Sequence, residues 1–442
     1  MIASTSNFTK KSKSHFEWLT ISIFLFTLFT IPKLNLKIGS VPVYFIDLIS
    51  VYLIFKYREF YKNVTTKNRV IFFLLIGGLY INQLYYFLSS NDLLYTCYMS
   101  FRFTIPLLSL ITFYPKIFHQ LKYYPKFYVK VLVLSCFISS IIILLFSFQS
   151  TRYFIVDLIN FKFLNPAAGL DGNFFLKRIG NDNAIRGQSL VGISIISGYF
   201  LLLGLGIIFT FLKKIELKHI LFFVFCFLCA FLTYSRQIFI CCSLIILFFL
   251  VSTNSKKISS FVFVFILITI YQWENISTNQ NFMFDRIQNT LINVDYDGGT
   301  KLLRHSIDER LYSYIKPFED LQNQPIYFLV GRSITATWSK HNPIYLNLNS
   351  VNNPDHSLFG KSFYVYGLMT CLVYMLILFE LMKYSFEAFR KKKLMFLYCI
   401  PIVIWSLFDH GIITQPHGSM MLFLIYVLCS CSITIKKDEV TC

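Results

Sequence analysis

The two long polar stretches of this chain, 150–186 and 274–356, contain no cysteine. The chain has 11 cysteines, and apart from Cys442 almost all of them lie within apolar segments. This distribution excludes a disulfide framework. Cys226 and Cys229 have a CxxC spacing, but they lie in an apolar run, where a metal or redox role is not favoured. The sequence also lacks internal repeats and low-complexity stretches.

Charged side chains are scarce as well, at 14% of the chain, whereas hydrophobic residues make up 55% and the mean hydropathy is +0.58. Apolar runs of about 18 residues or more recur along the whole sequence. The first run, from Trp18 to Pro32, follows several lysines but no small-residue cleavage site, so we expect a membrane span rather than a signal peptide. The composition therefore predicts an all-α, polytopic integral membrane protein.

Windows long enough to cross about 30 Å of hydrocarbon give twelve predicted spans. They are expected near 17–33, 38–55, 70–89, 93–114, 128–149, 187–211, 219–235, 237–254, 258–273, 357–382, 394–409 and 417–435. The chain then divides into N-terminal membrane helices (1–149), a medium-sized loop (150–186), central membrane helices (187–273), a large loop (274–356) and C-terminal membrane helices with a short tail (357–442).

A net charge of +19 is compatible with a nucleic-acid partner, but the distribution of the basic residues favours a different interpretation. Lysine and arginine gather in seven clusters that all fall on one side of the twelve-span arrangement. By the positive-inside rule this side is the cytoplasm. We therefore expect both termini in the cytoplasm, the two long loops in the periplasm, and no nucleic-acid partner.

The large loop holds the two residues best suited to chemistry, Arg310 and His356. The planar fork of arginine binds phosphate oxygens bidentately. Histidine accepts a proton near neutral pH, which suits the activation of a sugar hydroxyl. His356 immediately precedes an apolar segment, where the headgroup of a lipid-linked substrate would lie. A lone histidine there is more often an interfacial residue, so the prediction depends on the surrounding pattern.

Arginines outside the large loop leave two interpretations open. Arg236 lies between two apolar runs, and it is either a snorkelling or helix-capping charge or an anion ligand that faces the bundle interior. Arg178 and Arg186 stand at the end of the first long loop and are either solvated charges or substrate contacts.

Ionisable residues also occur within or beside other apolar segments. Arg102 lies inside one of them and is expected to face protein, a cavity or a headgroup, because a charge facing lipid is costly. At the last outer turn, a structural hydrogen-bonding role is favoured for Asp409, His410 and His417.

Several segments resemble the motifs of the O-antigen polymerase and ligase superfamily. They are Arg310–Phe318, Gln324–Gly331, Asp355–Leu358 and Tyr366–Leu368. In that family an arginine opens a short helix, a Pro-x-x-x-Gly-like turn follows, and a histidine motif precedes a span that carries a glycine. Ser235 and Arg236 are similar to the Ser-Arg pair of an earlier span, whereas Arg332 stands where the family has a second glycine.

The resemblance implies a GT-C-like arrangement and a metal-independent, inverting glycosyl transfer on undecaprenyl-diphosphate-linked glycans, without a cofactor. In this interpretation Arg236 and Arg310 bind the donor diphosphate, since fixed arginines at a water-poor interface stabilise the charge of the leaving group. His356 accepts the proton of the incoming sugar hydroxyl and is oriented by Asp355. Further candidate substrate contacts are Arg304, Arg332, Arg186 and Arg178. The closest match to a metal-binding DxD motif, Asp295 to Asp297, is not expected to hold a metal.

The favoured function is polymerisation of lipid-linked repeat units into O-antigen or a related surface polysaccharide at the periplasmic face of a bacterial inner membrane. An O-antigen ligase, which transfers the glycan to lipid A-core, shares the motifs and stays open as an alternative. A flippase for the same units would need charged residues along a midplane cavity, whereas the ionisable residues here collect at the outer face. Expected partners are the lipid-linked glycan, membrane lipid, a chain-length regulator and a flippase.

Overall fold

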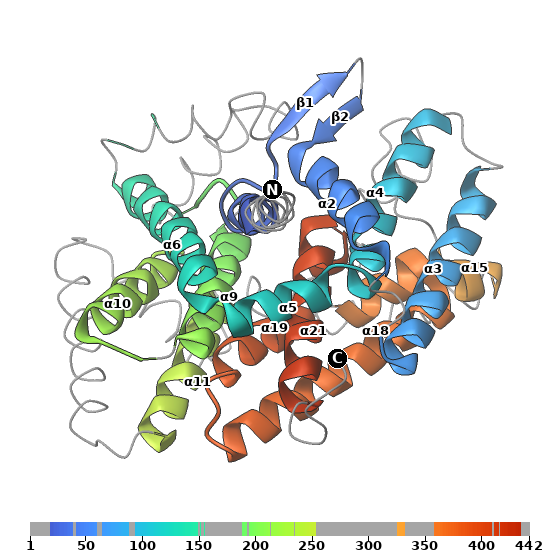
Figure 1. The fold of residues 1–442 in the computed structure, drawn as a ribbon. Coiled ribbons are helices and arrows are strands. Elements are labelled where there is room, and N and C mark those ends of the chain that lie inside the picture. The colour runs from blue at the N-terminus through green and yellow to red at the C-terminus, as the bar shows by residue number, and fades with distance from the viewer. Residues whose placement is uncertain are drawn as a thin grey trace, which may run out of the picture.

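The computed structural model describes residues 18–38, 41–59, 64–87, 93–148, 151, 154, 188–191, 194–212, 214–233, 235–252, 325–331, 358–408, 411–414 and 416–434. Within these ranges the fold is all-α apart from one short β-hairpin, in agreement with the predicted class (Figure 1).

The helices follow the apolar segments of the sequence. A first helix, Trp18–Thr30, leads into the hairpin of β1 (Asn35–Ile38) and β2 (Val41–Tyr44). The other helices are α2 (Phe45–Lys56), α3 (Thr66–Phe87), α4 (Leu93–Ile111), α5 (Tyr114–Tyr123), α6 (Pro125–Ser147), α9 (Ser194–Phe211), α10 (Leu217–Phe231), α11 (Arg236–Ser252), α15 (Pro325–Val330), α18 (Leu358–Arg390), α19 (Phe396–Phe408), α20 (Gly411–Thr414) and α21 (Pro416–Thr434).

The second predicted span, 38–55, is wrong in its first part. Strands β1 and β2 pair antiparallel, with Asn35 opposite Tyr44, and α2 begins only at Phe45. At 1.5 Å per residue, the 12 residues of α2 reach about 18 Å, which is less than the roughly 30 Å of a hydrocarbon core. A short apolar run does not distinguish a strand from a helix, and this explains the error.

The predicted basic connection 116–130 also contains a helix, α5. Prolines stand in the first turns of α5 and α6, where the missing amide hydrogen of proline costs no helical bond. Helix α5 buries Tyr114, Ile117 and Leu121 at helical spacing and leaves its basic side chains outside. The amphipathic pattern of this segment is therefore that of a helix lying against the bundle.

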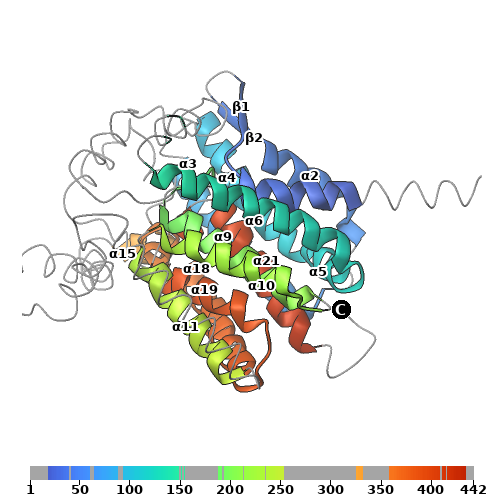
Figure 2. The same cartoon turned by 90° about the vertical axis from the view of Figure 1, so that its left-hand side faces the viewer.

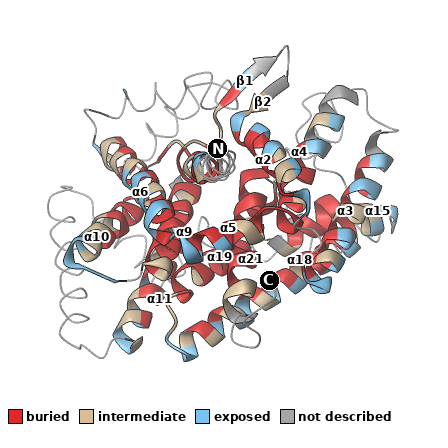
Figure 3. Cartoon of the chain, in the orientation of Figure 1, coloured by how far each residue is buried: buried red, intermediate tan, exposed pale blue. Residues whose placement is uncertain are grey.

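The core of the bundle is built around α21. Its residues from Met420 to Cys429 are buried on all sides, as expected for a helix that is apolar around its whole circumference. Figure 3 shows this buried helix between the other helices, whose outer faces are more exposed. Next to it, α9 and α19 are joined by stacked rings of Tyr199 and Trp405, with centroids 5.1 Å apart.

Two of the described helices are long and apolar enough to cross a membrane, Pro125–Ser147 and Ser362–Arg390. Several shorter apolar helices of 10–17 residues accompany them. Large hydrophobic side chains are exposed on the outer helices, among them Phe55, Ile81 and Phe386. Length and composition thus give a weak indication of membrane association.

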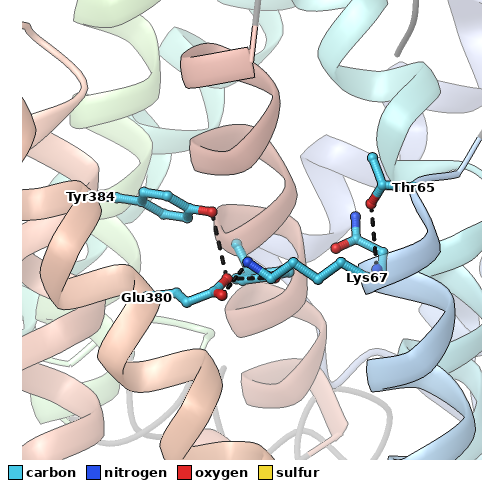
Figure 4. A network of polar contacts seen from close by, with 6 residues as sticks. Thr65, Lys67, Glu380 and Tyr384 are labelled. Atoms are coloured by element: carbon cyan, nitrogen blue, oxygen red, sulfur yellow. Dashed lines mark hydrogen bonds and ion pairs between the residues drawn. The ribbon is translucent and has the colours of Figure 1, made fainter.

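Helices α3 and α18 lie side by side and run antiparallel. Near the start of α3, Lys67 forms an ion pair with Glu380 in the later turns of α18 (Figure 4). Near the end of α3, the side-chain nitrogen of Asn82 donates a hydrogen bond to the carbonyl of Val365, early in α18, at 2.9 Å. The Glu380 carboxylate also accepts a bond from the Tyr426 hydroxyl at 2.8 Å, which ties α21 to the same pair.

Basic residues gather at one end of the bundle. The Lys116 ammonium of α5 lies 5.8 Å from the ring of Tyr57, just after α2, and the rings of Trp18 and Tyr124 lie 5.3 Å apart. These contacts place the start of the first helix, the end of α2 and α5 together. We call this the basic end, and Figure 2 shows α15 at the opposite end from α5. The opposite end is called the junction end below.

Candidate functional site

Of the residues predicted to carry the chemistry, the structure describes only the backbone of Arg236, which begins α11. The others lie outside the described residues: His356, Arg310, Arg304, Asp355, Arg332, Arg186 and Arg178. The same holds for the predicted span 258–273 and for Asp409 and His410. The structure does describe the segments that adjoin Arg332, Asp355 and His356 in the sequence, and these segments meet at the junction end.

The first feature of this end is a contact between α15 and an interruption of α18. Gly331 follows α15 and has a φ of +73°. Gly367 interrupts α18 with φ 78° and ψ 179°, a conformation that is essentially restricted to glycine. Both glycines belong to the segments that resemble the polymerase and ligase motifs. The first segment of α18, between Leu358 and this interruption, follows His356 in the sequence by one residue.

The backbones of these two segments touch directly. A Cβ atom added to Gly331 would lie 2.4 Å from the carbonyl oxygen of Val365, and one added to Gly367 would lie 2.2 Å from that of Leu329. Nearby, the rings of Phe328 and Phe363 make an edge contact with centroids 5.2 Å apart. We call this contact of α15 with α18 the glycine junction. Its two glycines are required both for backbone conformation and for close approach.

Asn82 of α3 ties the glycine junction together. It is fully buried, and its side-chain nitrogen donates hydrogen bonds to the carbonyls of both Val330 and Val365. Val330 ends α15, and Val365 precedes the interruption of α18. A side-chain donor at this place satisfies carbonyls at the end of one helix and beside the break of another.

The second feature of the junction end is the turn between the end of α19 at Phe408 and the start of α21 at Pro416. Gln237, which follows Arg236, donates a hydrogen bond from its side chain to the carbonyl of Phe408 at 2.9 Å. The hydroxyl of Tyr366, next to the interruption of α18, donates to the carbonyl of Ile413 at 3.3 Å. The start of α11 and the glycine junction are therefore both anchored to this turn.

A small cavity lies between the turn and the glycine junction. It is lined by Leu75, Leu79, Phe103, Leu107, Tyr366, Thr370, Tyr374, Ser419 and Phe423. The lining is mainly aromatic and aliphatic with a few hydroxyl groups, and the free space is about that of one water molecule, which is too small for a ligand. It adjoins the glycine junction through Tyr366 and the first turns of α21 through Ser419.

Arg102 faces protein, as predicted for a charge within an apolar segment. Its Nε atom donates to Oδ2 of Asp47 at 2.7 Å, and its guanidinium carbon lies 3.6 Å from the centre of the Tyr44 ring. His417 departs from the prediction of a hydrogen-bonding role. Its imidazole is buried against Phe200, and among the described residues its Nε2 atom has no hydrogen-bond partner.

Sequence reasoning missed Asn82, Gln237 and the pairing of Asp47 with Arg102. The signal for Asn82 was a polar amide within an otherwise apolar run, and the same holds for Gln237. Asp47 stands in the first turn of α2, 55 positions before its partner, and no local pattern links the two. In the described part of the chain, no group of three or more His, Cys, Asp or Glu side chains is placed to hold a metal ion.

No protein-family model matches the chain, and no curated protein is significantly similar to it.

Proposed function

We propose that this chain is a membrane-embedded glycosyltransferase that polymerises undecaprenyl-diphosphate-linked repeat units into O-antigen or a related surface polysaccharide. The observation that carries the proposal is the glycine junction. Two segments that resemble motifs of the polymerase and ligase superfamily, Gln324–Gly331 and Tyr366–Leu368, are separated in the sequence but contact each other through their backbones. Contact between such segments is what a shared functional site requires.

The arrangement of charge supports the proposed membrane orientation. Lys67 and Lys116 lie at the basic end, whereas Arg236 and the glycine junction lie at the other. Under the positive-inside rule, the basic end faces the cytoplasm and the junction end faces the periplasm. We propose twelve spans with both termini in the cytoplasm and the active site at the periplasmic face of a bacterial inner membrane.

In the proposed mechanism, His356 accepts the proton of the acceptor sugar hydroxyl. The hydroxyl oxygen attacks the anomeric carbon of the donor chain from the face opposite the diphosphate, so that the configuration inverts. The bond from that carbon to the diphosphate oxygen breaks, and undecaprenyl diphosphate leaves with the electron pair. Arg236 and Arg310 stabilise the charge that develops on the leaving diphosphate.

The glycine junction has a supporting role in this mechanism. Asn82 fixes the first segment of α18, and this segment directly follows Asp355 and His356 in the sequence. A catalytic base must lie within hydrogen-bond distance of the hydroxyl, so the helix segment next to it in the sequence must be held in place.

The proposal is tested by deleting the gene and complementing the strain with variants. The deletion strain should make lipopolysaccharide with core plus one repeat unit, because single units are still ligated but not joined. Wild type should restore long chains, whereas His356→Ala and Arg310→Ala should not, at equal amounts of protein in the membrane. Loss of all O-antigen from the core, with polymer on the carrier lipid, would instead identify a ligase.

Arg310→Lys separates two forms of diphosphate binding. Lysine keeps the charge but cannot bind two oxygens with a planar fork. We expect this variant to fail as well, and full activity in it would remove bidentate binding from the mechanism.

A further inference from the structure

Helix α5 is too short to cross a membrane and lies against the bundle at its basic end. Its 10 residues reach about 15 Å, half of the roughly 30 Å of a hydrocarbon core. It packs against α21 and crosses it in the view of Figure 1. The bundle covers one side of α5, and the other side forms an outer surface together with the first turn of α6.

The exposed side chains of this outer surface are all basic or aromatic. We call it the α5 surface, and it consists of His119, Lys122, Tyr123, Tyr124, Lys126 and Phe127. The rings of His119 and Tyr123 have centroids 4.4 Å apart, and the Lys122 ammonium lies 5.2 Å from the centre of the same Tyr123 ring. An imidazole and an ammonium group are thus held beside one exposed ring.

The first helix adds an aromatic side chain to the α5 surface. The ring of Trp18 lies 5.3 Å from that of Tyr124 and 6.1 Å from that of Phe127. Tryptophan and tyrosine are enriched where a membrane meets water, because their rings are apolar and carry one polar group. The aromatic part of the surface therefore has the composition of a segment at the level of the lipid headgroups.

The positive charge of the α5 surface has no acidic counterpart in its own part of the sequence. Positions 93–156 contain no aspartate or glutamate. Beside the surface, the Lys116 ammonium lies 5.8 Å from the Tyr57 ring, and the exposed Arg58 and Glu59 that follow Tyr57 offset each other in charge. A partner with complementary charge is an anion.

An apolar stripe continues the α5 surface along α6. Lys130, Leu134 and Phe137 are exposed and lie on one face of α6 at helical spacing. Helix α6 is long and apolar enough to cross a membrane, so the stripe runs from the charged surface towards the middle of the helix. A molecule with an anionic head and an apolar tail matches both parts, whereas a nucleic acid or a small soluble anion matches only the first.

We propose that the α5 surface binds an anionic phospholipid, with the chemistry of phosphatidylglycerol, in the leaflet at the basic end. Lys122 and Lys126 contribute point charges to the phosphate, and one acyl chain lies along Leu134 and Phe137. The inference goes beyond the proposed polymerase activity, because the surface lies at the end opposite the glycine junction and no glycosidic bond is formed there.

Native mass spectrometry of the full-length protein in detergent tests the proposal. Phosphatidylglycerol and phosphatidylcholine with the same acyl chains are offered together at equal concentration, and the ratio of the two bound lipids is measured. Each lysine beside an anionic headgroup adds about fivefold to the affinity, so Lys122 and Lys126 together predict a preference for phosphatidylglycerol of about tenfold or more. Equal binding of the two lipids overturns the proposal. Displacement of bound phosphatidylglycerol by glycerol 3-phosphate also overturns it, since the ligand would then be a soluble anion.

Paired substitutions assign the preference to the α5 surface. Lys122→Gln with Lys126→Gln should bring the ratio close to one, and the thermal unfolding midpoint should stay close to that of wild type because both side chains are exposed. Lys383→Gln with Lys392→Gln removes the same charge from exposed positions in and just after α18 and serves as the matched control. Its ratio should stay as in wild type. A ratio unchanged in the first pair, or lowered equally in both pairs, would overturn the proposal.

Discussion

Replacing Asn82 by leucine, which has nearly the same size and shape, removes the two hydrogen bonds that hold the glycine junction. The carbonyls of Val330 and Val365 then lose this donor in a buried place. A buried polar group left unsatisfied costs about 1–3 kcal/mol, so the two together destabilise the junction by roughly 2–6 kcal/mol. Since every 1.4 kcal/mol is a factor of ten, local opening should become about 30- to 20,000-fold more populated.

Hydrogen–deuterium exchange of the protein in detergent measures this opening directly. We expect Asn82→Leu to accelerate exchange by about that factor in 325–331 and 358–367, because local stability governs exchange in each cooperative unit. Exchange in α6, which does not contact Asn82, should stay as in wild type. The glycan chain length in complemented cells should fall in parallel.

Asn68, near the start of the same helix, provides the matched control. It is also a buried asparagine of α3, but it lies at the basic end. Asn68→Leu should leave exchange in 325–331 and 358–367 unchanged. If Asn82→Leu also left it unchanged, Asn82 would not hold the junction and its role as a positioning residue would be refuted.

Three further changes have defined outcomes. Gly367→Ala should lower the free energy of unfolding by about 1–3 kcal/mol or more, because the added Cβ strains the backbone and overlaps the carbonyl of Leu329. Gly77→Ala, where an added Cβ meets nothing within 4 Å, should leave it unchanged, and thermal unfolding compares the two variants. Glu380→Ala should destabilise by about 1 kcal/mol, since its partner Lys67 is half-exposed, and a double-mutant cycle with Lys67→Ala measures their coupling. The hydrogen bond and charge of Lys218 hold the pKa of Glu216 below its ordinary value. The contribution of this carboxylate to the free energy of unfolding is therefore full above the unfolded-state pKa and is lost as pH falls through the folded-state pKa. Glu216→Gln should remove this dependence from a profile of stability against pH between pH 3 and pH 7.

Much of the helical framework was predictable from the sequence because long apolar runs have few alternatives. The predicted spans 128–149 and 417–435 correspond closely to α6 and α21. The hairpin at 35–44 was not predictable in the same way, since a few apolar residues in a row fit a strand as well as a helix. The helix α5 was missed because its basic residues were interpreted as a connection between spans.

The glycine junction was not predictable from the sequence, and the predicted site residues other than the backbone of Arg236 lie outside the described residues. The motif resemblance drew attention to Gly331 and Gly367, but only the structure brings their backbones together. Asn82 escaped notice because one amide within an apolar run has no pattern that points to its partners. Arg102 was expected to face protein, a cavity or a headgroup, and the identity of Asp47 as its partner depends on the packing of α2 against α4.

The central claim is that the chain forms glycosidic bonds between lipid-linked repeat units with His356 as the base. The most direct measurement uses the purified protein in nanodiscs with undecaprenyl-diphosphate-linked repeat units as the sole substrate, followed by mass spectrometry of the glycans. The account predicts chains of two or more units and release of undecaprenyl diphosphate with wild type, and single units only with His356→Ala. Chains formed by His356→Ala at the wild-type rate, or none formed by correctly folded wild type, would contradict it.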